Sequence, residues 1–205
     1  MRKEYRPFPF NTSKKKTIVF FMSTPASIIL LGMKHCGKTT TGKILAGKLS
    51  RPFIDSDDEI ARLSGKTPRE LWDIGGAELM MEWETKACES VFTRYAPGAG
   101  NEQCVLATGG GIADNRAACD ILARTGTTVY LDTAFDLLYE RVRESARRDG
   151  RLPPFLQGPD PEGAFKELFS RRSAIYATIA EVIVTTGRLP PAEIATAIMG
   201  LLANE

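Results

Sequence analysis

One segment of the sequence combines the residue types that bind a nucleoside triphosphate. Residues 32–39 read Gly-Met-Lys-His-Cys-Gly-Lys-Thr, with the spacing G-x-x-x-x-G-K-T, between a short apolar run and a helical pattern. In such a segment, backbone N–H groups and the N-terminus of the following helix hold the phosphates. The Lys38 amine reaches the β- and γ-phosphates, and the Thr39 hydroxyl binds Mg²⁺. The pattern therefore predicts a P-loop that binds ATP or GTP together with Mg²⁺.

Several residues of this loop are expected to contact the nucleotide through their main chain. Gly32 and Gly37 allow the backbone to approach the phosphates closely. The side chains of His35 and Cys36 are expected to point away from them. Because Cys36 lies beside a helix N-terminus, a lowered thiol pKa and sensitivity to oxidation form a second hypothesis. The predicted nucleotide contacts of the loop are Gly32, His35, Cys36, Gly37, Lys38, Thr39 and Thr40.

Two carboxylates follow the next extended segment of the chain. Asp55 and Asp57 are two residues apart, so from an extended chain they project in the same direction. One could serve the water shell of the metal, and the other could accept a proton from an acceptor hydroxyl. Alternatively, both open the helix that carries Ile60, because aspartate is favoured at helix N-caps. The acidic pair is therefore a candidate for the metal and the catalytic base.

Three consecutive glycines, Gly109, Gly110 and Gly111, follow the apolar run at 104–108. Open α/β sheets bind ligands at the carboxyl ends of their parallel strands. Glycines at such a place let a ligand lie against bare backbone, so we expect them to line the acceptor site. The alternative is a flexible turn without a ligand.

The order of the elements indicates how these residues are positioned. Apolar runs predict strands at 27–31, 104–108, 127–131 and 182–184, in addition to the extended segment that runs into Asp57. Helical patterns cover 41–49, 114–124, 133–147, 164–180 and 191–202. Their alternation predicts an α/β fold with a five-stranded parallel sheet and helices on both faces. A Pro- and Gly-rich segment at about 148–161 predicts a mobile lid over the site.

Composition excludes several other classes of protein. The chain has 205 residues, of which 43% are apolar, enough to form the core of one domain at 27–205. A net charge of +2 argues against a general nucleic-acid binder. Residues 1–26 are predicted to be a disordered extension, although the uncharged stretch at 17–33 imitates a membrane anchor. Four scattered cysteines and one histidine favour neither zinc nor disulfides. We therefore expect a cytoplasmic protein, a monomer without membrane or nucleic-acid partners.

Five motifs in order give the chain a family likeness. The sequence resembles the shikimate kinases, small P-loop kinases that transfer the γ-phosphate of ATP to a ring hydroxyl of shikimate. The resemblance covers about 27–202. It rests on the P-loop with Thr39-Thr40, the F-x-D-x-D at 53–57, the glycines at 109–111, Leu-Gln-Gly-Pro-Asp at 156–160 and Arg-Ser-Ala-Ile-Tyr at 172–176.

The resemblance implies a role for each motif. Asp57 would hold the acceptor hydroxyl and take its proton, and Asp55 would serve the magnesium shell. Arg172 would grip the acceptor carboxylate with its planar fork, unless it is a surface arginine like its neighbour. An arginine before the lid, at position 147 or 148, would contact adenine. The residues so implied for the cofactors ATP and Mg²⁺ and for the acceptor include Arg148, Pro191, Gly109, Gly110, Gly111 and Arg172.

Two departures from the family pattern concern the acceptor. Met81 stands where the family usually carries a substrate-binding arginine, and Pro153 stands where it carries a lid arginine. Arg151 could compensate for the second. A charge-assisted hydrogen bond contributes about 1.5–3 kcal/mol, which corresponds to roughly one to two decades of affinity. Shikimate, converted to shikimate 3-phosphate, is the first expected acceptor. The first alternative is another polyol or hydroxy acid as acceptor, bound against an apolar wall of Met80, Met81 and Trp83. The second is that the protein is a non-catalytic nucleotide-binding regulator.

Overall fold

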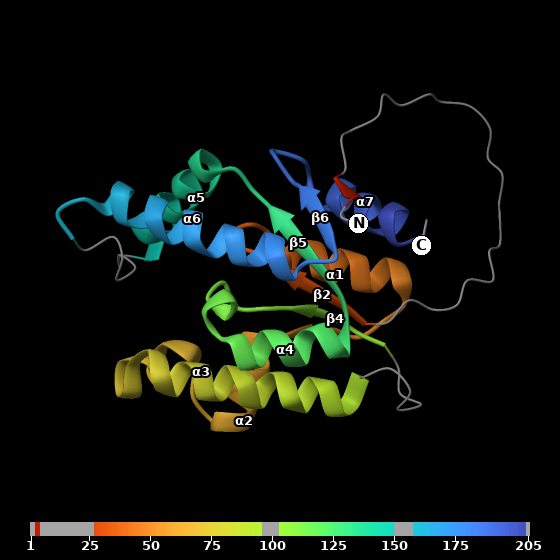
Figure 1. Cartoon of the computed structure of the whole chain (residues 1–205), viewed down its shortest axis with the longest axis horizontal. Helices are drawn as coiled ribbons and strands as arrows, with labels where there is room; N and C mark the ends of the chain where they lie inside the picture. The colour runs from red at the N-terminus through yellow and green to blue at the C-terminus, as the bar shows by residue number, and fades with distance from the viewer. Residues whose placement is uncertain (1–2, 5–26, 96–102, 150–157, 204–205) are drawn as a thin grey trace.

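A parallel sheet forms the centre of the protein. The computed structural model describes residues 3–4, 27–95, 103–149 and 158–203 (Figure 1). Every strand pair in this part of the chain is parallel, and the spatial order of the strands is β1-β6-β5-β2-β4-β3. The strands are β1 (Lys3–Glu4), β2 (Ser27–Leu31), β3 (Phe53–Asp55), β4 (Val105–Ala107), β5 (Gly126–Asp132) and β6 (Val182–Thr185).

The five-stranded parallel sheet predicted from the sequence is confirmed. All five residues of β2 are buried, as expected for a central strand with both faces covered. The two-residue strand β1 was not predicted and pairs with β6 at the edge of the sheet. The remainder of the predicted extension at 1–26 lies outside the described residues.

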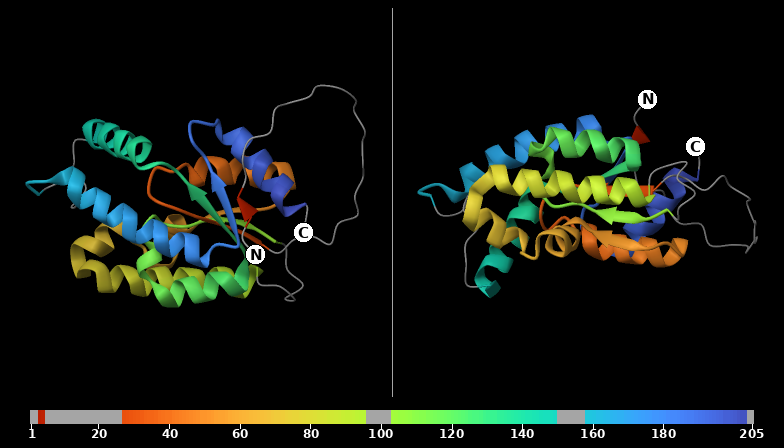
Figure 2. Two further views of the ribbon diagram at one scale, coloured as in Figure 1. Left: turned by 45° about the horizontal axis from the view of Figure 1, so that its top comes forward. Right: turned by 90° about the horizontal axis from the view of Figure 1, so that it is seen from below.

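Helices cover both faces of the sheet. Figure 2 shows α1 and α7 on one face and α4 and α6 on the other, with α3 running along α4. The helices are α1 (Lys38–Leu49), α2 (Ser56–Ser64), α3 (Pro68–Tyr95), α4 (Arg116–Thr125), α5 (Phe135–Asp149), α6 (Pro161–Ile179) and α7 (Pro191–Leu202). One short 3₁₀ turn, Ile112–Asp114, precedes α4. None of the described helices is both long and apolar enough to cross a bilayer.

The long helix α3 was also not predicted from the sequence. It is interrupted by non-helical dihedrals at Gly75 and Gly76, where Gly76 has a φ of 60°. That left-handed conformation favours glycine, because a Cβ would clash with the backbone. The kink places the first turns of α3 at an angle to the rest, which packs along α4.

Sheet topology brings the predicted site residues to one edge. The P-loop follows β2, Asp55 ends β3, and the triple glycine follows β4. These three strands are neighbours, with Leu30 and Asp55 both in register with Ala107. Since parallel strands end at the same edge of a sheet, the three segments converge there.

Candidate active site

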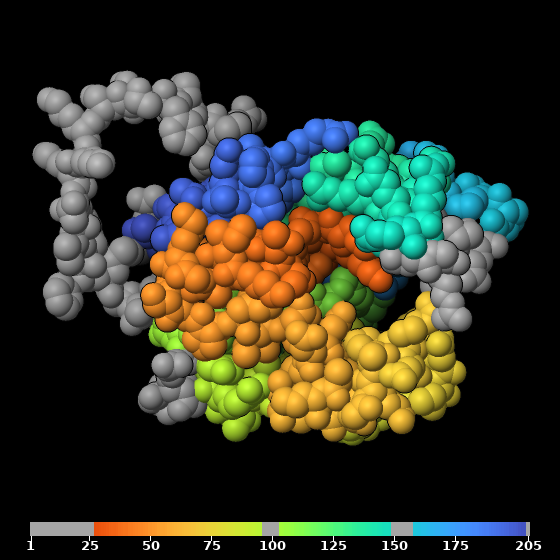
Figure 3. All heavy atoms as spheres, turned by 180° about the vertical axis from the view of Figure 1, so that it is seen from behind, coloured from red at the N-terminus to blue at the C-terminus, as the bar shows by residue number. Residues whose placement is uncertain are grey.

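Two cavities open at this edge and share part of their walls. The P-loop cavity has a volume of about 520 Å³ and extends from the P-loop and Asp55 to α5. The α3 cavity has a volume of about 310 Å³ and lies between the glycine turn, α3 and α6. Figure 3 shows the hollow between the P-loop, α2 and α3, and α5. The residues that line both cavities are Lys34, Asp57, Gly109 and Gly110.

The P-loop wraps around the amine of its own lysine. Lys38 is buried, and its Nζ donates hydrogen bonds to the carbonyl oxygens of Gly32 at 2.8 Å and Met33 at 2.9 Å. A Cβ on Gly32, whose φ is 143°, would lie 2.8 Å from the Cys36 Sγ, so the close turn requires glycine. Lys38 lines the P-loop cavity, where its amine can meet a phosphate.

The two unusual side chains of the loop differ in position. His35 lines the P-loop cavity with a φ of 65°, and its carbonyl accepts a hydrogen bond from the Arg141 Nη1 at 3.1 Å. The Cys36 side chain is only 1% exposed and packs in the core beneath the loop. The hypothesis of an oxidation-sensitive Cys36 is therefore not supported, because a buried thiol is shielded from oxidants. Its main-chain contact to a nucleotide stays a prediction.

Asp55 joins the P-loop to the start of α2. Its Oδ2 accepts a hydrogen bond from the Thr39 Oγ1 at 2.9 Å, and its Oδ1 accepts one from the Asp57 backbone N–H at 3.1 Å. Asp55 is therefore the N-cap of α2 as well as a partner of the P-loop threonine, so its N-cap interpretation is confirmed and its role in the magnesium shell stays a prediction. The Thr39 hydroxyl and the Asp55 carboxylate are hard oxygen donors of the kind that Mg²⁺ prefers.

The metal would depend on the nucleotide for further ligands. Within the described ranges, no three or more His, Cys, Asp or Glu side chains form a group that could hold a metal ion. Magnesium in kinase sites is commonly held by one or two protein groups, by phosphate oxygens and by water. The pair of Thr39 and Asp55 fits such a shared site.

Asp57 lies where the two cavities meet. Partial enclosure by the cavity walls raises the pKa of its carboxyl, and the negative charge of Asp55 raises it further. The nearby amines of Lys38 and Lys34 act in the opposite direction. A Cβ on Gly109 would lie 3.1 Å from the Asp57 Oδ1, so a glycine leaves room beside this carboxylate. A carboxylate with a raised pKa at this junction is suited to accept a proton from a ligand bound in either cavity.

The glycine turn also anchors Arg172. The carbonyl of Gly110 accepts hydrogen bonds from the Arg172 Nη1 and the Tyr176 hydroxyl, both at 3.1 Å. The Arg172 Nε and Nη2 donate to the Asp114 Oδ2 at 3.1 and 2.8 Å, and Arg171 bonds the same carboxylate. Burial alone would raise the pKa of Asp114, but the two arginines outweigh it and lower the pKa. Arg172 lines the α3 cavity in a fixed orientation rather than being a free surface arginine.

The far wall of the α3 cavity is largely apolar, with one buried acid. Met81 lines the cavity beside Met80 and Trp72, whereas Trp83, predicted for this wall, is not among the lining residues. Glu84 is 6% exposed, and burial raises the pKa of its carboxyl. The Asn115 Nδ2 donates to the Glu84 Oε2 at 3.2 Å and to the Met81 carbonyl at 2.7 Å. Asn115 thereby holds the helix turn that carries both Met81 and Glu84.

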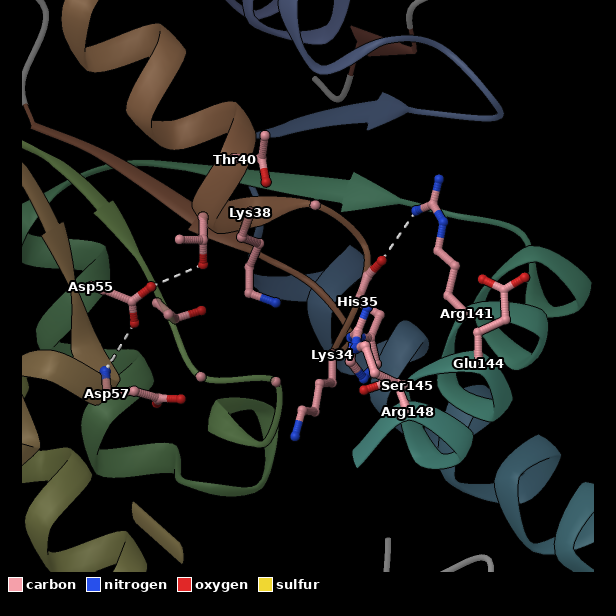
Figure 4. Close-up of a pocket in the computed structure, with 15 residues that line it drawn as sticks. Lys34, His35, Lys38, Thr40, Asp55, Asp57, Arg141, Glu144, Ser145 and Arg148 are labelled. Carbon is pink, nitrogen blue, oxygen red and sulfur yellow. Dashed lines mark hydrogen bonds between the residues drawn. The ribbon is translucent and has the colours of Figure 1, made fainter. Parts of the chain in front are cut away.

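Of the two arginines that were candidates for contacting adenine, one lies on the α5 side of the P-loop cavity. Arg148 lines it, together with Arg141, Glu144 and Ser145, whereas Arg147 does not (Figure 4). Pro191 is the first residue of α7 and lines neither cavity, so its contact to adenine stays a prediction. The predicted lid residues at 150–157, which include positions 151 and 153, lie outside the described residues.

Several residues that line the two cavities were not predicted from the sequence. Lys34 occupies a variable position of the P-loop pattern, and Arg141 lies on a helix face without a motif. Asp114 could have been suspected from its place three residues after the glycines. The residues missed include Lys34, Arg69, Trp72, Asp114, Arg141, Glu144 and Ser145.

Comparisons with known proteins agree with this geometry. A family model for shikimate kinase matches residues 34–203. The chain belongs to the shikimate kinase family. A shikimate kinase of Symbiobacterium thermophilum is 35% identical over 84% of this chain and 94% of its own. One of Dechloromonas aromatica is 36% identical over 80% of this chain and 82% of its own. A solved shikimate kinase of Acinetobacter baumannii in complex with shikimate superposes with a TM-score of 0.76 at 30% identity, over 88% of this chain and 94% of that one.

Proposed function

We propose that this kinase transfers the γ-phosphoryl group of ATP to a ring hydroxyl of shikimate, giving shikimate 3-phosphate and ADP. The observation that carries the proposal is the junction of the two cavities. One cavity is lined by the P-loop and the other by Arg172, and the carboxylate of Asp57 is open to both. A phosphate donor in one and an alcohol in the other would meet beside a proton acceptor, as in-line transfer requires. The curated relatives named above, at 35% and 36% identity, support the same reaction.

Each predicted site residue then has a specific task. Asp57 orients the acceptor hydroxyl and takes its proton as the oxygen–phosphorus bond forms. The Lys38 amine binds the β- and γ-phosphates, and the loop N–H groups hold them in place. Thr39 and Asp55 would hold Mg²⁺, which, when bound, neutralises phosphate charge. Gly109, Gly110 and Gly111 give the acceptor room against the backbone.

The recognition of the acceptor rests on few cations. Arg172 would bind the shikimate carboxylate with the part of its guanidinium that faces the α3 cavity. Arg148 and Pro191 would contact adenine, and Arg151 would assist from the lid. We expect the protein to act as a monomer in the cytoplasm.

The apolar wall favours a second candidate acceptor. Met81 and Met80 face the α3 cavity where a strongly acidic acceptor would gain from a cation. A polyol or hydroxy acid with less need of anion recognition would fit this wall. A gluconokinase of Sinorhizobium meliloti shares the fold with a TM-score of 0.51 at 19% identity, which shows the fold alone.

A coupled ADP-release assay across several acceptors tests the proposal. Shikimate, quinate, gluconate and simple polyols are compared at saturating ATP and Mg²⁺, with turnover without acceptor subtracted. We expect the highest kcat/KM for shikimate. A higher kcat/KM for another acceptor would show that this compound, and not shikimate, is the substrate. Tight ATP binding without turnover of any acceptor would instead support a nucleotide-binding regulator.

A further inference from the structure

Lys34 lines the site, and the proposed reaction assigns it no role. It lies within the P-loop, four residues before Lys38, and its side chain is exposed at the junction of the two cavities. We propose that Lys34 binds the phosphoryl group while it passes from the nucleotide to the acceptor hydroxyl, as a second lysine of the P-loop. The inference rests on the proposed function and adds a catalytic residue to it.

Lys34 lies at the junction of the two cavities. Four described residues line both the P-loop cavity and the α3 cavity, and Lys34 is the one cation among them. The others are the carboxylate of Asp57 and two glycines. The transferred group must pass through the region that the two cavities share. A positive side chain at this place is therefore closer to the moving charge than one that lines a single cavity.

The backbone of Lys34 is held by contacts on both sides. The Cys36 N–H donates to the Met33 carbonyl at 3.3 Å, which closes a turn around Lys34 and His35. His35 takes the left-handed φ of 65° in this turn, and Arg141 holds its carbonyl. On the other side, a Cβ built on Gly110 would lie 2.5 Å from the Lys34 N, so the two backbones touch. The point at which the Lys34 side chain leaves the loop is therefore fixed at the junction of the two cavities.

The other cations of the site already have partners. The Lys38 Nζ donates to two loop carbonyls, and Arg172 donates to Asp114 and Gly110. Arg69, at the mouth of the α3 cavity, pairs with Asp73 at 3.1 Å. Lys34 makes no hydrogen bond or ion pair with any residue that the structure describes. In Figure 4 its side chain extends from the loop away from the helix that carries Arg141 and Glu144.

The proposed step balances without a further reagent. The bond between the γ-phosphorus and the bridging oxygen breaks, and ADP leaves with the electron pair. The acceptor oxygen forms the new bond to phosphorus, and its proton goes to Asp57. Lys34 stays an ammonium throughout and donates hydrogen bonds to a phosphoryl oxygen, where charge is spread in the transition state.

The test compares Lys34→Met with Lys48→Met, which removes the same charge from the end of α1 outside both cavities. We expect Lys34→Met to lower kcat about 100-fold, as expected for a lost transition-state donor, with the Kd of ATP and the KM of shikimate changed less than about threefold. Lys34→Arg should recover part of kcat. Lys48→Met should behave as the unchanged enzyme, and thermal unfolding should show all variants folded.

A second acceptor separates this role from binding of the acceptor carboxylate. The methyl ester of shikimate lacks the negative charge but keeps the reacting hydroxyl. If Lys34 binds the phosphoryl group, Lys34→Met lowers kcat by the same factor with both acceptors. A loss confined to shikimate and seen mainly in KM would overturn the inference, because Lys34 would then bind the carboxylate. Normal kcat in Lys34→Met would overturn it too, whereas an unmodified enzyme inactive on shikimate would overturn the proposed function first.

Discussion

Replacing Gly110 by alanine tests the contact between the P-loop and the glycine turn. The added Cβ would lie 2.5 Å from the Lys34 N, 2.9 Å from its Cα and 3.0 Å from its Cβ. Two of these are backbone atoms, which cannot rotate out of the way as the end of a side chain can. Ordinary contacts of a Cβ begin at 3.4 Å, so the two segments must separate by about 0.9 Å.

This separation should cost both activity and stability. A displacement of about 1 Å between reacting groups can lower a rate about 100-fold, which corresponds to about 2.7 kcal/mol of activation free energy. Overpacking of this kind also lowers the free energy of unfolding by about 1–3 kcal/mol. The assay measures kcat and KM by coupled ADP release and Tm by calorimetry.

The neighbouring glycine provides the matched control. Gly111→Ala places its Cβ 3.6 Å from the Arg172 Nη2 and 3.9 Å from the Glu84 Oε1, both ordinary contacts, and its φ of −103° suits alanine. Because Gly111 lines the α3 cavity, the added methyl group narrows the acceptor site, so we expect KM for the acceptor to rise while kcat falls less than about threefold. Gly47→Ala, on the exposed side of α1 with nothing within 4 Å, should leave activity unchanged and raise stability by about 0.5–1 kcal/mol. Equal losses in Gly110→Ala and Gly111→Ala would refute the reasoning.

Three further results are expected. Asp57→Asn should lower kcat about 100- to 10,000-fold with little change in the Kd of ATP. The base must be ionised to accept a proton, and the pKa of Asp57 is raised, so kcat/KM of the unchanged enzyme should start to fall on acidification at a higher pH than it would with an ordinary aspartate. Met81→Arg should lower the KM of shikimate about tenfold or more by adding a cation beside Glu84, and an unchanged KM would point to another acceptor. Free energies of unfolding, measured with urea at several pH values, should show opposite pH effects for the two buried acids Glu59 and Glu84. Hydrogen bonding to Arg62 holds the pKa of Glu59 at about 2. The ionised Glu59 therefore stabilises the folded state above pH 4.5, and this stabilisation is lost as pH falls from about 4.5 towards 2. Glu59→Gln should lower the free energy of unfolding by about 2–3 kcal/mol at pH 7 and by progressively less in acid. Burial raises the pKa of Glu84, so the native protein loses stability as pH rises above about 4.5, and Glu84→Gln should be more stabilising at pH 7 than at pH 4.

Local pattern was enough to predict the sheet and the centre of the site. The P-loop and the three glycines follow the buried strands β2 and β4, and Asp55 and Asp57 lie at the end of the edge strand β3. Because parallel strands end at one edge, the order of the elements alone implied that these residues meet. The N-cap and metal interpretations of Asp55 could not be separated by spacing. The structure shows that this carboxylate caps α2 and accepts a hydrogen bond from the Thr39 hydroxyl, and its metal role stays a prediction.

Helix α3 could not be predicted in the same way. Its double glycine argues against a continuous helix, and only packing along α4 shows how the segment is held. The place of Met81 and Glu84 on one cavity wall depends on this packing and on Asn115, which bonds both. Arg172 was predicted as a carboxylate ligand, but its hold on Asp114 and Gly110 is visible only in three dimensions.

The sequence by itself determined the nucleotide loop and the strand ends that carry the acids, because short-range spacing dictates backbone geometry there. Only the tertiary structure decided that two cavities meet at Asp57, that the Cys36 thiol lies in the core and that Lys34 faces both cavities. The physical reason is that side chains from segments far apart in the chain share one space. Which of them find partners, and which remain open to a ligand, depends on packing that no single segment encodes.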